Sequence, residues 1–541
     1  MNNTIPNELD STEIYVALRD GLALHKQGHL TQAEAIYKKV LCIDSNDSRA
    51  LFLMGVIAYD QGEYELSIEL INDSLKVNPA NFEGWLYLSH SQLNFGQVAE
   101  ALGSCERAIQ INSTSAQAHF SRGNLLFRLN RFDEALSSLT TAIGLKTDYA
   151  EAYLSHGSTL KQLGHFQKAY ESFEKAILYR ENYVEAYYNR GVVLQELNLL
   201  EAAIESYDEA IRLNPDYAEA CLNKSIALLT LGKYQQAWPL YEMRWHKEKR
   251  KLPATADLQA RWSGQQVLTG KTVLVYAEQG LGDTIQFFRY VEGVSQLGAN
   301  VILQVPKPLV PLFLGLQGEA VVIEEGAPVP PYDFHCALMS LPGVFRTELT
   351  NIPNATGYLT AAPDKSNYWV TRLGEKKGLR VGLVWSGALR TPRDKERSLS
   401  LRQLLRYLPK DLEYFCLQKE VRDADRVEFC SHSVNFFVEE IHDFADTAAL
   451  CDLMDLIISV DTSVAHLAGA MGKPTWVLLP FSGDWRWLRE SEDSLWYASM
   501  RLFRQGVDRQ WPPVLERMAQ EIHNLGIARL RNPSECQRCV K

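Results

Sequence analysis

The sequence contains no apolar stretch near the roughly 20 residues that a helix needs to cross a bilayer. Its first residues, Met-Asn-Asn-Thr-Ile-Pro, lack the apolar core of a secretory signal peptide. Nine cysteines scattered over 541 residues are atypical of a disulfide framework. A formal net charge of −11 argues against non-specific nucleic-acid binding, which needs a basic face. These absences predict a cytoplasmic protein with no membrane span and no nucleic-acid partner.

Clustered metal ligands are also scarce. Cys536 and Cys539 form a lone CxxC pair near the end of the sequence, with no second pair or histidine close by. Structural zinc normally takes four such ligands. We therefore expect no metal site, and we interpret the pair as part of a frayed tail.

The first half of the sequence repeats with a period of 34 residues, the step from Gly21 to Gly55. One series of small residues runs through Gly21, Gly55, Ser89, Gly123, Gly157, Gly191 and Ser225, and a second runs through Ala33, Ser67, Ala101, Ala135, Ala169, Ala203 and Ala237. Helices pack closely only where the facing side chains are small, so the two series predict stacked helix pairs. At 541 residues the chain should form about three domains, of which this array is the first.

The period and the small positions resemble the tetratricopeptide repeat, with seven units from about Ile14 to Lys251. The resemblance implies an α-solenoid whose first helices line a groove for a peptide or another protein. The groove candidates on these helices are Tyr153, Tyr187, Tyr188, Asn189 and Asn223. Two alternatives remain open: the aromatic side chains pack between repeats, or the array serves only to form a homo-oligomer.

The last repeat departs from the pattern, because residues 238–245 are rich in aromatic side chains and lead into a basic stretch. The end of a solenoid must be covered. We therefore predict that this segment docks the array onto the part of the chain that follows.

From Leu252 onward, apolar runs alternate with helical patterns, which is typical of parallel sheets. The expected strands lie at 273–277, 301–305 and 321–323, and then at 379–384, 413–417, 456–460 and 474–480. Residues 351–367 are rich in Pro, Asn and Gly and are predicted to link two domains. The predicted domains are therefore a repeat array at 1–251, an α/β domain at 252–365, and a second α/β domain with a C-terminal helix and tail at 366–541.

A glycine-rich loop follows the first predicted strand and ends in a carboxylate, Asp283. Gly280 and Gly282 permit a sharp turn and the close approach of a bulky group. The following helix offers free N–H groups, which suit an anion. The loop matches neither the P-loop nor the dinucleotide fingerprint, so a purely structural turn is the alternative.

Three further groups of residues follow strands of the last domain. The first comprises Ser386, Gly387, Arg390, Arg393, Lys395 and Arg397. Arginines beside a strand end suit a diphosphate, although a solvated basic loop is the alternative. The second comprises Asp461, Thr462, Ser463 and His466. It suits a sugar phosphate, although a helix N-cap and a core histidine are the alternatives. The third contains Asp484, in a capping loop or a packing segment.

These motifs are similar to a GT-B glycosyltransferase with two Rossmann-like domains, most of all to the bacterial heptosyltransferase family, over about residues 270–525. The resemblance implies that Asp283 is the general base and that Asp461 contacts the donor sugar. It also implies that the amides after Asp461 hold the diphosphate. Members that act on lipopolysaccharide lack a repeat array, so neither a heptose donor nor a lipid acceptor is implied. The combined layout resembles bacterial protein O-glycosyltransferases, including those that modify flagellin.

The expected function is therefore an inverting, metal-independent glycosyltransferase. It would move a sugar from a nucleotide-diphospho sugar, its co-substrate, to Ser or Thr hydroxyls of a protein, for instance a flagellin, held in the groove. No other cofactor is expected. Glu278, on the same loop as Asp283, is the rival base. Two alternatives remain: a glycan or lipid-linked acceptor, with the repeats binding partner proteins, and a catalytically inactive scaffold.

Overall fold

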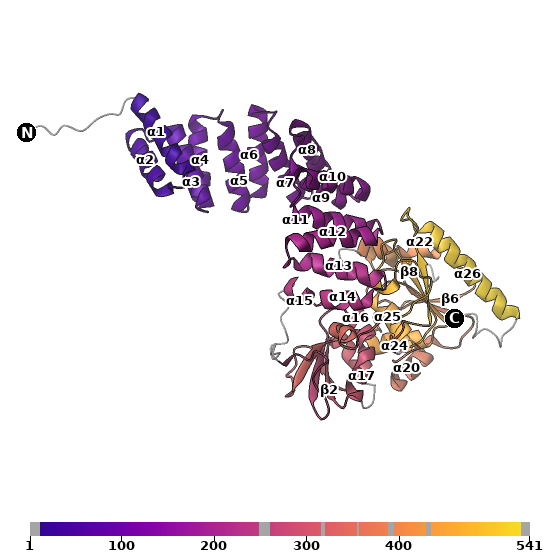
Figure 1. The fold of residues 1–541 in the computed structure, drawn as a ribbon. Helices are drawn as coiled ribbons and strands as arrows, with labels where there is room; N and C mark the ends of the chain where they lie inside the picture. Colours follow the sequence, from indigo (N-terminus) through magenta and orange to yellow (C-terminus); the bar gives the residue numbers. More distant parts are fainter. Residues whose placement is uncertain are drawn as a thin grey trace, which may run out of the picture. The chain divides into compact units, whose positions relative to one another are not determined.

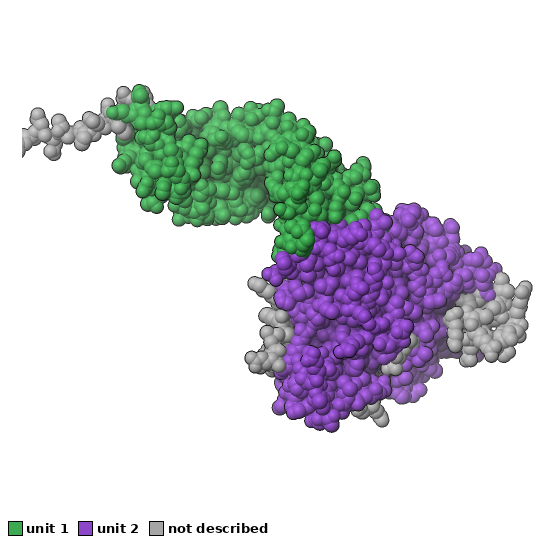
Figure 2. Space-filling model, viewed as in Figure 1, with its two compact units in different colours: residues 1–197, 212–214 green, residues 198–211, 215–541 purple. Residues whose placement is uncertain are grey.

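A computed structural model describes residues 11–247, 260–314, 320–353, 356–387, 394–428 and 434–531. The chain divides into two compact units, coloured separately in Figure 2. Unit 1 comprises residues 1–197 with 212–214, and unit 2 comprises residues 198–211 with 215–541. The boundary between the units falls inside the repeat array, so the last repeats belong with the C-terminal half.

The predicted α-solenoid is confirmed as seven helix pairs (Figure 1). The pairs are α1 (Ser11–Lys26) with α2 (Leu30–Ile43), α3 (Ser48–Asp60) with α4 (Tyr64–Val77), α5 (Phe82–Asn94) with α6 (Val98–Ile111), α7 (Ala116–Arg128) with α8 (Phe132–Leu145), α9 (Ala150–Gln162) with α10 (Phe166–Tyr179), α11 (Val184–Glu196) with α12 (Leu200–Leu213), and α13 (Ala218–Thr230) with α14 (Tyr234–Tyr241).

The small residues of the period are the contact points within each pair. A Cβ atom at Gly157 would lie 2.7 Å from Cε1 of Phe173, and one at Gly55 would lie 2.5 Å from Cγ1 of Ile71. The turn between paired helices takes a positive φ, for example 76° at Gly164 and 58° at Asn130. Asparagine tolerates this left-handed conformation better than other side chains do, which explains why it replaces glycine in two of the turns.

Unit 2 contains two sheets in which every pair of neighbouring strands is parallel. The first has the order β3-β2-β1-β4 and the second β6-β5-β7-β8-β9. The strands are β1 (Thr272–Tyr276), β2 (Asn300–Val305), β3 (Val321–Glu324), β4 (Phe334–Ala337), β5 (Arg380–Val384), β6 (Glu413–Cys416), β7 (Leu456–Val460), β8 (Thr475–Leu479) and β9 (Met500–Arg504). The expected parallel sheets are therefore present, and β4 and β9 are additions to the predicted strands.

Among the described residues after the array, twelve α-helices and several short 3₁₀ turns accompany these strands. The helices are α15 (Arg244–Lys247), α16 (Leu281–Phe287), α17 (Val291–Gln296), α18 (Val310–Leu314), α19 (Leu341–Val344), α20 (Pro363–Leu373), α21 (Asp394–Arg397), α22 (Leu401–Leu405), α23 (Asp423–Arg426), α24 (Phe444–Asp452), α25 (Ser463–Ala470) and α26 (Pro512–Arg531). The 3₁₀ turns used below are η2 (Phe288–Tyr290), η4 (Leu338–Ser340) and η6 (Trp485–Trp487). No helix in the part of the chain that the structure describes has the length and apolar character to span a bilayer.

Strand order marks where a ligand would bind. In each sheet the chain first adds strands on one side and then reverses, between β1 and β4 in the first sheet and between β5 and β7 in the second. Open parallel sheets bind ligands outside the carboxyl ends of the strands at this reversal. The loops that follow β1, β4, β5 and β7 are therefore the places to look for a site.

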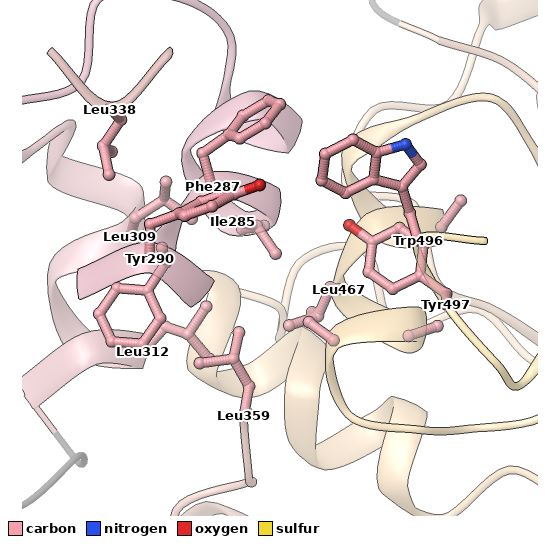
Figure 3. Packing of buried hydrophobic residues seen from close by; sticks show 14 of the residues in the cluster. Ile285, Phe287, Tyr290, Leu309, Leu312, Leu338, Leu359, Leu467, Trp496 and Tyr497 are labelled. Atoms are coloured by element: carbon pink, nitrogen blue, oxygen red, sulfur yellow. The ribbon is translucent and has the colours of Figure 1, made fainter. Parts of the chain in front are cut away.

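The last repeat and both sheet regions share one hydrophobic core, part of which Figure 3 shows around α16. Tyr234 and Trp238 of α14 pack edge-on against Trp485, at ring distances of 6.1 and 5.8 Å. The Trp496 indole N–H donates to the Tyr234 hydroxyl at 3.0 Å, and that of Trp238 donates to the Thr347 carbonyl at 2.9 Å. These contacts confirm that the aromatic end of the array docks onto the α/β region.

The packing inside the repeats generates a test of the fold. Gly157→Ala should destabilise unit 1 by about 1–3 kcal/mol, because the new methyl group overlaps the Phe173 ring. Gly144→Ala, also in a repeat helix, is the matched control, since its Cβ meets nothing within 4 Å and alanine is the better helix former. Urea unfolding followed by circular dichroism measures both. Equal midpoints for the two variants would contradict the assigned contact.

Candidate active site

The loop after β1 is shaped by Asp283, which caps the helix that the loop begins. The Gly280 N–H donates to Asp283 Oδ2 at 2.9 Å, so the carboxylate folds back over the start of α16. The Asp283 side chain remains 23% exposed. The glycine loop is therefore a strand-to-helix turn, and its carboxylate lies at the carboxyl edge of the first sheet.

Gly282 brings this loop against the second sheet region. A Cβ atom here would lie 2.8 Å from Cδ2 of His466 and 3.3 Å from Cα of Ser463. Both residues belong to α25, the helix that follows β7. The group that closely approaches Gly282 is thus the amino-terminal part of α25. This contact places α16 beside α25.

Arg486 joins the two sheet regions through its guanidinium group. Nη2 donates to Asp283 Oδ1 at 2.5 Å, and Nε donates to Gln286 Oε1 at 2.5 Å, both on α16. Nη1 donates to Asp484 Oδ1 at 2.8 Å, within the loop after β8. Arg486 was not among the predicted site residues, although it lies only two positions after Asp484.

Charges around Arg486 offset the cost of its burial. Burial alone would lower the pKa of this guanidinium, but Asp484 and Asp283 raise it overall. Burial likewise favours the neutral form of Asp484, whereas Arg486 outweighs that effect and lowers the pKa of the carboxyl. Asp484, predicted to bind donor, is therefore an ionised partner of Arg486 in this structure.

Asp461 ends β7 at the carboxyl edge of the second sheet. Its backbone carbonyl accepts from Arg397 Nη1 at 2.8 Å, which ties the loop after β7 to α21. The N-cap of α25 is Thr462, so the alternative that Asp461 caps this helix is not what the structure has. Burial, and secondarily the nearby charge of Asp484, raises the pKa of Asp461 to about 6.

His466 is buried between ring systems. It stacks on Trp487 with 5.4 Å between centroids, and its Nδ1 lies 3.1 Å from the Tyr497 hydroxyl. Its Nε2 is 3.8 Å from Asp461 Oδ1, beyond hydrogen-bond range. Burial, and secondarily Arg486, lowers the pKa of His466 to about 3. These contacts favour the core-histidine alternative, in which the neutral ring packs between Trp487 and Tyr497.

The basic loop after β5 is described in part, because Arg390 and Arg393 lie outside the described residues. Lys395 is exposed on α21, while Ser386 is buried and accepts from Gln418 Nε2 at 3.2 Å. Gly387 and Arg397 approach closely, since a Cβ atom on the glycine would overlap the guanidinium. Arg397 Nε is buried, lies 3.7 Å from Asp394 Oδ1 and makes no hydrogen bond within the described residues.

Glu278, the rival base, lies in a different environment from Asp283. Its side chain is 5% exposed and accepts from Arg244 Nη2 at 3.1 Å. A buried carboxylate paired with a buried guanidinium is poorly placed to meet an incoming hydroxyl. The two positions favour Asp283 over Glu278.

The groove candidates in unit 1 are partly buried in the repeats. The Tyr153 ring stacks on Tyr179 at 5.6 Å, Arg190 lies over the Tyr187 ring, and Asn189 Oδ1 accepts from Lys161 Nζ at 2.8 Å. Tyr188, also in unit 1, and Asn223, on α13 of unit 2, are of intermediate exposure. These contacts give Tyr153 a packing role within the repeats.

A pocket of about 780 Å³ lies elsewhere on the first helices of unit 1. It is lined by residues of α1, α3, α5 and α7, among them Tyr59, Tyr87 and His90. The Tyr59 and Tyr87 rings meet edge-on at 5.8 Å. These residues were not predicted, because Tyr59 and Tyr87 lie on first helices of neighbouring repeats at positions that the 34-residue period does not relate.

No group of three or more His, Cys, Asp or Glu side chains suited to a metal ion occurs within the described ranges. Cys536 and Cys539 fall outside those ranges. The candidate site is therefore built from carboxylates, guanidinium groups and a helix start.

Models of the tetratricopeptide repeat family match residues 52–116, 116–149, 150–183 and 184–217. The resemblance of the array to this repeat is thereby confirmed. Tetratricopeptide repeats are a protein-binding architecture, so the array indicates association with another polypeptide.

Curated relatives include Protein FlbA of Caulobacter vibrioides, 26% identical over 335 residues, which are 54% of this chain and 53% of that protein. Tetratricopeptide repeat protein 37 of Xenopus laevis is 35% identical over 114 residues, 20% of this chain and 7% of that protein. The chain thus spans about half the length of the first relative and a small part of the second.

Similar solved structures align with about a third of the chain. A crystal structure of MamA has 26% identity and a TM-score of 0.29, covering 31% of this chain and 97% of MamA. The structure of YrrB, described as a tetratricopeptide repeat protein with an unusual peptide-binding site, has 21% identity and a TM-score of 0.31, covering 34% and 95%.

The raised pKa of Asp461 generates a pH-dependent test. The pKa of Asp461 is about 6 in the folded protein, above the roughly 3.9 of an unfolded chain. The folded state therefore binds the proton more tightly, and the stability that this binding contributes is lost as pH rises through 6. Asp461→Asn should therefore raise the melting temperature by a few degrees at about pH 8 and change it little at about pH 4. Asp484→Asn should instead lower it at pH 8, because Arg486 loses a partner. Thermal melts across pH that showed one sign for both variants would contradict these environments.

Proposed function

We propose that unit 2 is an inverting glycosyltransferase of the GT-B type, using a nucleotide-diphospho sugar and needing no divalent metal. The observation that carries the proposal is the meeting of Asp283 with Arg486, each from a loop at the carboxyl edge of a different parallel sheet. That arrangement brings a carboxylate from one sheet region together with cations from the other, as group transfer to a hydroxyl requires.

The donor would lie mainly on the second sheet region. The amides at the start of α25, together with the guanidinium of Arg397, would bind its diphosphate. Arg504 adds a partly buried guanidinium near Asp461; burial lowers its pKa to about 10, so it remains charged at neutral pH. Asp461 would accept hydrogen bonds from sugar hydroxyls, as the family resemblance implies.

The reaction would proceed in one displacement. Asp283 takes the proton of the acceptor hydroxyl while the hydroxyl oxygen forms a bond to the anomeric carbon. The bond from that carbon to the phosphate oxygen breaks, and the nucleoside diphosphate leaves with its electron pair, inverting the configuration. General-base catalysis of this kind typically raises the reaction rate roughly 10²–10⁴-fold. Cations and helix amides would absorb the charge that develops on the leaving group.

The acceptor is proposed to be a Ser or Thr hydroxyl of a protein recruited by the repeats, with flagellin as one instance of the class. The first helices of unit 1 carry the aromatic pocket around Tyr59 and Tyr87, which suits an extended polypeptide. A second candidate is a scaffold without catalysis. It is favoured by one observation, that the family models match only repeat residues of this chain.

The first experiment tests the base. Purified full-length protein is screened with nucleoside diphosphates by thermal shift and then with the matching nucleotide sugars for turnover. Asp283→Asn should lower turnover by about 10²–10⁴ and leave nucleotide stabilisation intact. Glu292→Gln, an exposed carboxylate on α17, is the control and should behave as the wild type.

Near-wild-type turnover in Asp283→Asn would remove that residue as the base. Absence of any nucleotide response in the wild type would instead favour the scaffold.

The second experiment tests recruitment. Deleting residues 1–111 removes the first three repeats and the pocket around Tyr59, and it keeps α13 and α14 in the core of unit 2. Because repeats contact only their neighbours, the remaining array should fold. Transfer to a protein acceptor should fall sharply, whereas turnover with a small saccharide or water should stay unchanged. Undiminished transfer to protein would exclude recruitment by these repeats.

A further inference from the structure

The loop that carries Asp283 is held from two directions. At its far end Asp283 is bound by Arg486 of the second sheet region. At its near end, Glu278 accepts from Arg244 and the Gln279 amide donates to the Tyr241 hydroxyl at 2.9 Å. Tyr241 ends α14, the last repeat helix, and Arg244 begins α15 directly after it. The end of the repeat array thus contacts the proposed catalytic loop.

Arg244 also occupies the reversal point of the first sheet. Besides Glu278 after β1, it donates to Ser340 Oγ after β4 at 2.7 Å, so it joins the two loops that flank the reversal. Glu242 accepts from the same guanidinium at 2.6 Å. The place where a parallel sheet ordinarily offers a ligand site is therefore filled by a side chain from the repeats.

These contacts are buried and therefore geometrically demanding. Arg244 is 2% exposed, and its guanidinium lies over the rings of Tyr241 and Trp245. A buried ion pair persists only when its partners keep their geometry, because a displaced charge loses both its partner and its solvent. Between the two ends, the Gly280 N–H is capped by Asp283 and Gly282 packs against α25, so the contacts of Arg244 and Tyr241 complete the support of the loop.

We infer that Arg244 and Tyr241, at the end of the repeat array, are positioning residues for the β1–α16 loop and hence for Asp283. This inference rests on the proposed function of Asp283. It gives the array a second role besides recruitment: turnover requires the end of the last repeat even when the acceptor is too small to reach the groove. Catalysis in the transferase region would then depend directly on the last repeat.

The test is a double variant, Arg244→Met with Glu278→Leu, in the full-length protein. Replacing Arg244 and Glu278 by apolar side chains of similar size avoids an unpaired buried charge, because Glu242 keeps its ion pair with Arg261. The fold should therefore persist, with a melting temperature within about 5 °C of wild type. Turnover of the nucleotide sugar with a small acceptor or water should fall about tenfold or more in kcat. KM for the donor should stay within about twofold of the wild-type value, since the proposed donor-binding residues follow strands of the second sheet.

Hydrogen exchange supplies a readout that does not need activity. Amides of residues 279–283 should exchange about tenfold faster in the double variant. Glu201→Gln is the matched control. It breaks the ion pair between α12 and Arg489 of the second sheet region, 2.8 Å long, and it leaves the loop untouched. If the double variant does not fold, Tyr241→Phe removes only the hydroxyl that Gln279 contacts and should lower kcat by about twofold to fivefold.

The outcomes separate the two proposals. A folded double variant with wild-type kcat and unchanged exchange would overturn the positioning role while leaving the glycosyltransferase intact. A wild-type protein that turns over no nucleotide sugar would overturn the proposed function. In that case faster exchange of residues 279–283 in the variant would still show that the array anchors the loop.

Discussion

The guanidinium of Arg486 is the constraint on which the site depends. It contacts Asp283 and Gln286 of one sheet region and Asp484 of the other, and it is 6% exposed. This guanidinium could not lie so deep without the two carboxylates, because an unpaired buried charge costs several kcal/mol. The contact of Gly282 with α25 depends on the same alignment, since helices meet this closely only at fixed orientation.

Arg289 is a second buried arginine that links the two sheet regions. Its guanidinium donates to the Trp496 carbonyl at 2.8 Å and lies over the rings of Tyr358 and Tyr497. Tyr358 belongs to the predicted linker, and its backbone N–H donates to Ala470 at the end of α25. The connecting segment is therefore ordered by hydrogen bonds where it is described, and it holds the two sheet regions side by side rather than merely joining them.

The sequence predicts the helices and strands of this fold better than the tertiary contacts between them. The 34-residue period locates all seven helix pairs, because each repeat buries its small residues locally. The short strand β4 was overlooked, since four residues including a histidine carry little periodic signal. Arg244 and Arg486 were overlooked for a different reason: a cation 34 residues from Glu278, or 203 from Asp283, becomes its partner only through tertiary packing.

The charged groups of the candidate site nearly balance one another. Three carboxylates, of Asp283, Asp461 and Asp484, face three guanidinium groups, of Arg397, Arg486 and Arg504. Such a cluster is close to neutral, so a diphosphate needs further positive charge to displace water from it. Lys395, which is exposed on α21 with Arg397, supplies one such further cation after β5. In the proposed reaction, the fixed ion pairs would hold Asp283 in place, and this cation would add affinity for the donor.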